Sequence, residues 1–327
     1  MNEKNIIETV LLLALPASGK SEVRTYMSTL SDEVCLKDFH MGPTVQLDDY
    51  PYVHFMRCVD EELIGRGKPS IYFITPDKPF KDPRQWGTLV ELLNEDHVNL
   101  YAHNKTHPKS AAEWLFARLD AAAGKAGATG PGSSLDAATR NALADTLEKE
   151  ARHILDERNA ASDEKLEGRT LVIEFARGGA QGSPMPLPEP FGYGYSVSML
   201  SPAILKNASI LYVWVTPEES RRKNFERARP DGQGSILHHG VPIDVMMNDY
   251  GCDDMDWLEK TSEKPGTVTI TAASGGGKFH LPLGRFDNRV DKTSFIRKDR
   301  RDWTDGEIAG IHGGLKQGFD AIIAKCR

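Results

Sequence analysis

Short apolar runs recur along the chain, and each is bounded by turn-forming residues. Continuous runs of this length are typical of parallel strands that are buried on both faces of a sheet. The first run ends at Leu15 and is followed by a turn of small residues, whereas the run that starts at Thr170 ends in charged residues. Predicted strands cover residues 10–15, 44–47, 70–74, 170–175, 209–215 and 267–271.

Most of the segments between these runs have apolar residues at helical spacing. In residues 52–64 and 83–93 the apolar positions recur three and four residues apart, as they do on the buried face of a helix. A further helix is predicted from Pro217, because Thr216 suits the N-cap and proline suits the first helical position. Strands that alternate with helices predict an α/β fold, with a doubly wound, mostly parallel sheet and helices on both faces.

One region departs from this alternation. Two Ala-rich helical segments, residues 111–123 and 135–159, flank a Gly-rich stretch at 124–134 that has the composition of a linker. Farther along, residues 267–283 predict a hairpin whose turn, 274–278, is rich in glycine. The predicted division is an α/β core of residues 1–101 and 168–327, a helical insertion at 102–167 and a lid region at about 221–260.

Composition narrows the class of protein. A net charge of −7 over 327 residues argues against a protein that binds nucleic acid mainly through phosphate contacts. The four cysteines contain no C-x-x-C pair, so we expect a reducing, cytoplasmic environment. No apolar stretch approaches the length of a membrane-spanning helix, and we therefore expect no membrane partner.

The end of the first predicted strand carries the clearest chemical signal. Residues 14–21 follow the pattern G-x-x-x-x-G-K-[ST], except that Ala14 replaces the first glycine. In this pattern, backbone N–H groups and a lysine hold phosphate oxygens, and a hydroxyl faces Mg²⁺. The alternative is an ordinary strand–turn–helix with a chance Gly-Lys-Ser. The predicted nucleotide-binding residues are Leu15, Pro16, Ala17, Ser18, Gly19, Lys20 and Ser21, with Ser21 also at the metal.

Acidic residues follow two later strands. Asp48 and Asp49 come directly after the second predicted strand, where a carboxylate can accept a proton from a substrate hydroxyl. Glu174 and Arg177 end the strand at 170–175; the acid is placed to orient Mg²⁺ and the base to hold an anion. Acidic capping of a helix and an exposed charge pair are the structural alternatives. We favour Asp48 over Asp49 as the catalytic base.

A cation-rich helix follows Pro217. Five cations lie within residues 221–229, and the Gly-containing loop after them has the composition of a hinge. Arg222 and Arg229 are the candidates for neutralising a phosphoryl group in transfer. The alternative is that these side chains are solvated charges near a helix C-terminus.

In the order of these elements, the chain resembles the P-loop nucleoside and nucleotide kinases. The resemblance rests on the phosphate loop, the acidic pair after the second strand, Glu174 with Arg177, Tyr195-Ser196 and Thr216-Pro217-Glu218 before the Arg-rich helix. It covers residues 1–100 and 165–295. It implies ATP and Mg²⁺ as cofactors, catalytic roles for Lys20 and Arg177, and a place for Asn288 in the loop that holds the nucleotide base.

We therefore expect an ATP- and Mg²⁺-dependent phosphotransferase that acts on a small hydroxyl-bearing molecule or a nucleoside. The alternative is a P-loop ATPase or nucleotide switch that works with a macromolecular partner. A third possibility, which fits the Ala14 substitution, is a protein that binds nucleotide without turnover. The chemistry of the acceptor is left open by the sequence.

Overall fold

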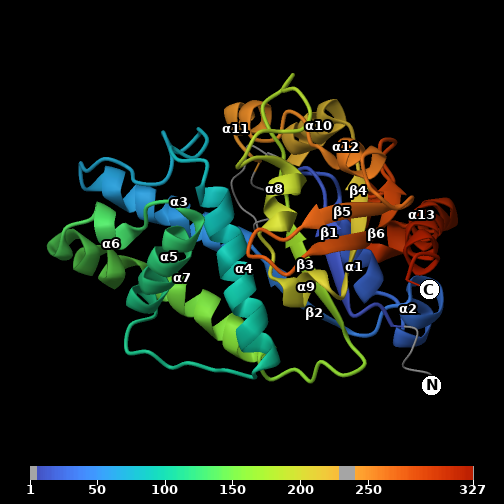
Figure 1. Cartoon of the computed structure of the whole chain (residues 1–327), viewed down its shortest axis with the longest axis horizontal. Helices are drawn as coiled ribbons and strands as arrows, with labels where there is room; N and C mark the ends of the chain where they lie inside the picture. The colour runs from blue at the N-terminus through green and yellow to red at the C-terminus, as the bar shows by residue number, and fades with distance from the viewer. Residues whose placement is uncertain (1–5, 228–239, 327) are drawn as a thin grey trace.

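The protein is built on a six-stranded sheet. The computed structural model describes residues 6–227 and 240–326. The strand order is β2-β3-β1-β4-β6-β5, in which the first five strands are parallel and β5 pairs antiparallel with β6 at one edge (Figure 1). The predicted α/β class with a mostly parallel sheet is confirmed, and so is the hairpin formed by β5 and β6.

The elements follow one another in the order α/β proteins show, with a long helical stretch between β2 and β3. The strands are β1 (Thr9–Leu13), β2 (Thr44–Asp48), β3 (Thr170–Phe175), β4 (Ala208–Trp214), β5 (Thr267–Thr271) and β6 (Lys278–Asp287). The helices are α1 (Lys20–Ser28), α2 (Asp32–Phe39), α3 (Tyr50–Gly65), α4 (Gln85–Tyr101), α5 (Ala111–Ala126), α6 (Pro131–Ser134), α7 (Ala137–Ala161), α8 (Gly192–Ser198), α9 (Pro202–Leu205), α10 (Pro217–Arg227), α11 (Ile243–Asn248), α12 (Met255–Lys260) and α13 (Asp305–Ile323), with short 3₁₀ turns η3 (Ser294–Arg297) and η4 (Arg300–Asp302).

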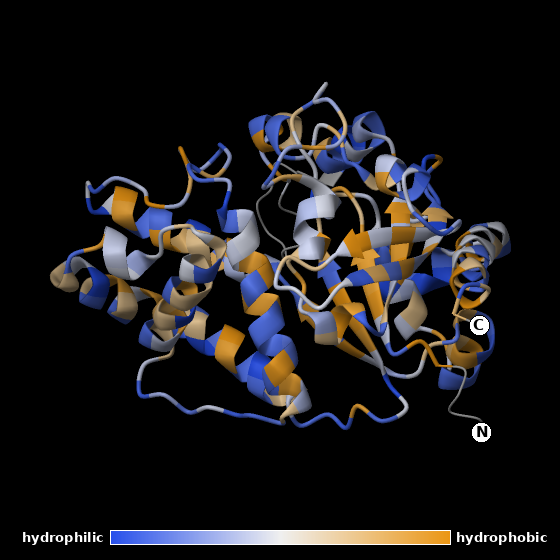
Figure 2. Cartoon of the chain, viewed as in Figure 1, coloured by the Kyte–Doolittle hydropathy of each residue, from blue (hydrophilic) through white to orange (hydrophobic). Residues whose placement is uncertain are grey.

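Helices cover both faces of the sheet. On one face, Leu12 and Val172 pack with apolar side chains from α1, α2 and α13. On the other face, Leu13 and Phe175 pack with side chains from α4, α8, α9 and α12. All five residues of β1 are buried, which explains why the strand reads as an unbroken apolar run. Figure 2 shows the same contrast, since the central strands are the most hydrophobic part of the chain.

The prediction of a strand at residues 70–74 is wrong. The backbone there makes only an isolated bridge from Phe73 to Phe80. Instead, the Asp60 carboxylate accepts hydrogen bonds from the backbone N–H groups of Ile71 and Phe73, both at 2.7 Å, and of Tyr72. These N–H groups are therefore satisfied by a buried side chain rather than by a neighbouring strand.

Helices α3 to α7 form a helical lobe beside the sheet (Figure 1). Helix α3 begins at Tyr50, directly after β2, and packs with α5 and α7 in one apolar cluster. Helix α4 belongs to both regions, since Leu89 and Leu92 contact the lobe while Val90 and Leu93 lie in the cluster under the sheet. The region predicted as a helical insertion contains α5, α6 and α7, and α3 and α4 pack against them.

A buried polar network holds the lobe together. Arg118 on α5 donates to Asp96 on α4 at 2.6 Å and to the Tyr52 hydroxyl on α3 at 3.0 Å. Arg158 on α7 and the Tyr52 hydroxyl also donate to Asp96. Asp96 is only 6% exposed, so one carboxylate joins four helices in a place that water reaches poorly.

We predict that Asp96→Ala lowers the free energy of unfolding by about 3–5 kcal/mol, because it leaves two cations in a buried site without their partner. The matched control is Glu95→Ala, which removes the neighbouring partner of Arg118 from a side chain that is 35% exposed and should cost about 1 kcal/mol or less. Urea titration of both variants measures the difference. Equal losses would show that the network does not hold the lobe.

Candidate functional site

The loop between β1 and α1 has an unusual backbone. Ala17 and Gly19 both have positive φ angles, 54° and 105°. A Cβ at position 19 would lie 2.5 Å from the Thr293 hydroxyl and 2.9 Å from the Asn288 amide nitrogen, so only glycine fits there. Ala14 is not among the described residues with positive φ, which means that alanine meets no backbone strain at the place of the first glycine.

Three alternate carbonyls of this loop are bound by side chains. Lys20 Nζ donates to the Ala14 carbonyl at 3.2 Å. The Ser220 hydroxyl of α10 donates to the Pro16 carbonyl, and the Asn288 amide donates to the Ser18 carbonyl, both at 2.7 Å. These contacts come from three separate parts of the chain and fix the orientation of three peptide planes.

Each of these carbonyls also fixes the N–H of the next residue in the chain. In a trans peptide the two groups point in opposite directions, so the N–H points away from the side chain that binds the carbonyl. The groups concerned belong to Leu15, Ala17 and Gly19, and none of them donates a hydrogen bond to any described residue. The Ser18 hydroxyl is also buried without a partner in the described part of the chain. The loop thus combines unused donors with the N-terminus of α1, an arrangement that suits an anion.

The segment after β6 supports the loop. The Asn288 side chain is fully buried: its amide nitrogen also donates to the Thr293 hydroxyl, and its oxygen accepts from the Lys292 N–H. Both ends of this amide are therefore occupied by protein. The predicted contact of Asn288 with a nucleotide base remains a prediction, and the structure gives this residue a positioning role in the loop.

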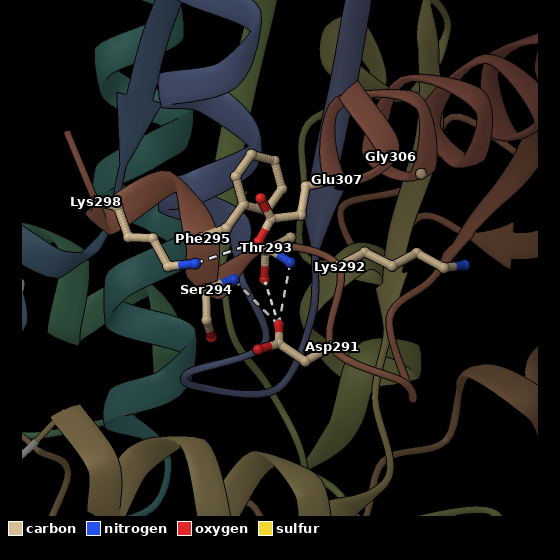
Figure 3. Close-up of a pocket in the computed structure, with 9 residues that line it drawn as sticks. Asp291, Lys292, Thr293, Ser294, Phe295, Lys298, Gly306 and Glu307 are labelled. Atoms are coloured by element: carbon tan, nitrogen blue, oxygen red, sulfur yellow. Dashed lines mark hydrogen bonds and ion pairs between the residues drawn. The ribbon is translucent and has the colours of Figure 1, made fainter. Parts of the chain in front are cut away.

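A cavity of about 420 Å³ lies between this segment and the start of α13. Figure 3 shows Asp291 accepting from Thr293 and Ser294, and Lys298 directed toward Glu307. Asp291 also pairs with the buried Lys223 of α10 at 2.8 Å. Although burial acts against ionisation, these hydrogen bonds hold the pKa of Asp291 below its usual range. The charges around this cavity thus already have partners, and the Asp291–Lys223 pair connects α10 to the segment after β6.

Two carboxylates lie together beside the loop. β1 and β3 are neighbours, and Glu174 pairs in register with Leu12 on one side and with Asp48 on the other. Arg24, one helical turn beyond Lys20, donates to Glu174 at 2.7 Å and lies 3.8 Å from Asp48. The sheet therefore brings Asp48 and Glu174 to the α1 face of its carboxyl edge, with one cation shared between them.

The environment of Asp48 favours its protonated form. Burial, followed by the nearby charges of Glu174 and Asp49, raises the pKa of Asp48 to about 7. A hydrogen bond from the Tyr50 N–H and the charge of Arg24 oppose this shift without cancelling it. A carboxylate with a pKa near neutrality is well matched to proton transfer at physiological pH.

Asp49 is placed quite differently. It pairs with Arg177 at 2.7 Å, and both side chains are almost fully buried. Arg177 also donates to the Ser196 hydroxyl at 3.0 Å and lies over the ring of Trp86, with its guanidinium carbon 4.7 Å from the ring centre. Arg177 is thus committed to contacts inside the protein, and Asp49 with it. This geometry supports a structural role for the pair at the junction of β3, α3 and α4.

The Arg-rich helix meets the loop through Ser220, not through its arginines. Arg222 is bonded to Glu219 and Glu226 on its own helix and is largely exposed. Arg221 bonds to Glu218, and its second terminal nitrogen is buried with no partner in the described residues. Arg229 lies outside the described residues. Of the two arginines that can be compared, Arg221 has the unused buried donor.

Sequence reasoning missed the residues that support the site. Arg24 was detectable as the next turn of the helix after Lys20, since positions four apart share a face. Ser220, Lys223, Asp291 and Thr293 gave no comparable signal, because their contacts join segments that are distant in sequence.

Comparison of the chain with protein-family models, with curated proteins and with solved structures finds no match. Among the described helices, none has the length and apolar character needed to cross a bilayer. The function of the site is therefore inferred from its own geometry.

We predict that Asp48→Asn weakens the dependence of stability on pH. The folded carboxyl has a pKa of about 7, above its usual 3.8, so the folded state binds more protons between these values and loses stability as pH rises through this window. Asn cannot titrate, so the melting temperature of the variant should fall less between pH 5 and pH 8. Asp145→Asn, at an exposed position, is the control. Parallel curves for wild type and Asp48→Asn would contradict the raised pKa.

Proposed function

We propose that the protein is an ATP- and Mg²⁺-dependent phosphotransferase that acts on a small hydroxyl-bearing molecule or a nucleoside. The observation that supports this most is the loop itself: three fixed N–H groups and the unpaired Ser18 hydroxyl surround the start of α1, where Lys20 lies. An ordinary strand–turn–helix does not require several donors without a hydrogen-bond partner. Phosphate oxygens, in contrast, accept hydrogen bonds from donors arranged in this way.

The position of the loop in the sheet supports the same function. Helix α1, after β1, covers one face, while α8, after the neighbouring β3, covers the other. Ligands of open parallel sheets bind where the connections of adjacent strands diverge in this way. The loop and Glu174 both lie at that point, which fits a doubly wound sheet of the P-loop kinase type.

Mg²⁺ fits the oxygen donors on this edge. The Ser21 hydroxyl and the Glu174 carboxylate are hard ligands of the kind that Mg²⁺ prefers, and phosphate oxygens and water complete its shell in nucleotide sites. Glu174 is bonded to Arg24 in this structure, so we propose that it acts on the ion through water. When bound, the ion offsets the negative charge of the phosphates.

In this proposal Asp48 accepts the proton of the acceptor hydroxyl. Its pKa of about 7 leaves a large unprotonated fraction at neutral pH, and β2 ends at the same edge of the sheet as β3, where Glu174 lies. Lys20 neutralises the phosphates. Of Arg221 and Arg222, the arginines of α10 whose side chains are described, Arg221 has the unused donor. Arg177 and Asp49 position the end of β3 against the helical lobe.

An assay of ADP formation separates this proposal from its rivals. Turnover that requires a nucleoside or sugar acceptor supports the phosphotransferase. Turnover without an acceptor would instead favour an ATPase or switch, and nucleotide binding without turnover would favour a ligand-binding protein.

We predict that Lys20→Ala removes most of the stabilisation by Mg²⁺-ATP. A ligand at one hundred times its dissociation constant adds about 2.7 kcal/mol to the stability of a protein that binds it. The wild type should show this gain in a thermal shift, as should the control Lys37→Ala, which removes an exposed lysine from α2. The same shift in Lys20→Ala as in wild type would exclude the loop as the nucleotide site.

We predict that Asp48→Asn mainly lowers turnover, whereas Asp49→Asn mainly lowers stability. With a confirmed acceptor, Asp48→Asn should lower kcat by roughly 10²–10⁴-fold with little change in ATP affinity, as expected for loss of a general base. Asp49→Asn leaves Arg177 buried without its charge partner, so its main effect should be a lower melting temperature. If Asp48→Asn keeps near wild-type turnover, the base is another residue.

A further inference from the structure

A second cavity lies under α1, away from the phosphate loop. Its volume is about 460 Å³, and it is bordered by α1, α2 and the sheet face that carries Val10, Leu12 and Val172. Figure 1 shows α1 and α2 next to the strands on this side of the sheet. The phosphate-binding interpretation makes no use of this space.

The cavity is a hollow that is partly open to solvent, not an internal void. Among its lining residues, Leu12, Val23 and Phe319 belong to the apolar cluster of this face and are at most 3% exposed. Pockets of a few hundred Å³ are the normal size for small-molecule sites.

The walls and the rim differ in chemistry. The floor is apolar, whereas Arg24, Thr44 and Gln46 supply hydrogen-bonding groups at the side of β2. Arg24 and Gln46 both point toward Glu174, at 2.7 Å and 3.5 Å, and Asp32 adds a further acid to the lining. Arg24 is therefore already paired, and the remaining acids disfavour an anion.

We propose that this cavity binds a small, uncharged molecule with an apolar body and a hydrogen-bonding end, oriented with that end toward Gln46 and Thr44. The site is separate from the phosphate loop, so it stands whether or not the protein transfers phosphate. An apolar body satisfies the floor, and neutral donors or acceptors satisfy the rim without adding charge beside Glu174.

Cys35 provides a reporter, because it lines the cavity and is half-buried. Burial raises the pKa of its thiol, so labelling with N-ethylmaleimide is done at pH 8 and followed by mass spectrometry. The probe is 1-naphthol, with 1-naphthoate and 1-naphthylmethylamine as charged analogues of the same shape. At ten times its dissociation constant, 1-naphthol should slow the labelling of Cys35 about tenfold. Cys58 and Cys252, which do not line the cavity, should be unaffected.

Two matched threonines test the location. Thr44 is exposed at the rim on edge strand β2, and Thr271 is exposed on β5 at the opposite edge of the sheet. Thr44→Phe should abolish the protection of Cys35, and Thr271→Phe should retain it. The proposal is overturned if 1-naphthol gives no protection, protects Thr44→Phe equally, or protects all three cysteines alike. Stronger protection by 1-naphthoate would overturn the preference for an uncharged ligand.

Two matched valine variants test whether the cavity has room for a larger group. Val172 lines the cavity, while Val213 lies on the same sheet face in the same apolar cluster but does not line it. A larger side chain in a filled core costs about 1–3 kcal/mol. Val213→Phe should lower the melting temperature accordingly, and Val172→Phe should lower it less and remove 1-naphthol protection. Equal destabilisation would mean that no space exists for a ligand.

Discussion

The proposed site depends on one constraint: side-chain hydrogen bonds fix the orientation of the carbonyls of Ala14, Pro16 and Ser18. A loop of small residues has many conformations of similar energy, and a short phosphate-binding turn requires one of them. Here the hydrogen bonds from Lys20, Ser220 and Asn288 hold three peptide planes. N–H groups that are already oriented need no reorganisation to accept the proposed phosphate, which is the general advantage of preorganised donors.

This constraint links elements that are far apart in the sequence. Ser220 belongs to α10 and Asn288 to the segment after β6, while the Lys223–Asp291 pair connects these two supports to each other. The loop, the Arg-rich helix and the last parallel strand therefore form one braced unit. Gly19 is part of it, because Thr293 and Asn288 pack where a side chain would otherwise lie.

Asp48 and Asp49 are adjacent in the sequence but have different surroundings. Side chains alternate along a strand, so Asp48 shares a face with Gln46 and Glu174, whereas Asp49 begins the turn into α3 and meets Arg177. Burial and like charges raise the pKa of Asp48, while the ion pair commits Asp49 to the junction with the helical lobe. Adjacent aspartates thus face different partners.

The sequence alone determined the features that depend on local pattern. Short runs rich in apolar and β-branched residues, bounded by turns, located β1 to β5 to within a few residues. The Gly-Lys-Ser turn located the loop. The sequence also placed Asp48 and Glu174 at strand ends, although not beside each other. The segment 70–74 was misread because an apolar run does not reveal that Asp60 will take its N–H groups.

Only the tertiary structure decided the order of the strands and the partners of each charge. Arg177, Arg222 and Asn288 each had a residue type suited to ligand binding, yet their contacts are with Asp49, with Glu219 and Glu226, and with the loop backbone. Nor does any local pattern show the cavity under α1, which arises from the way two helices meet a sheet. Such features depend on contacts between distant segments, and these form only when the chain packs.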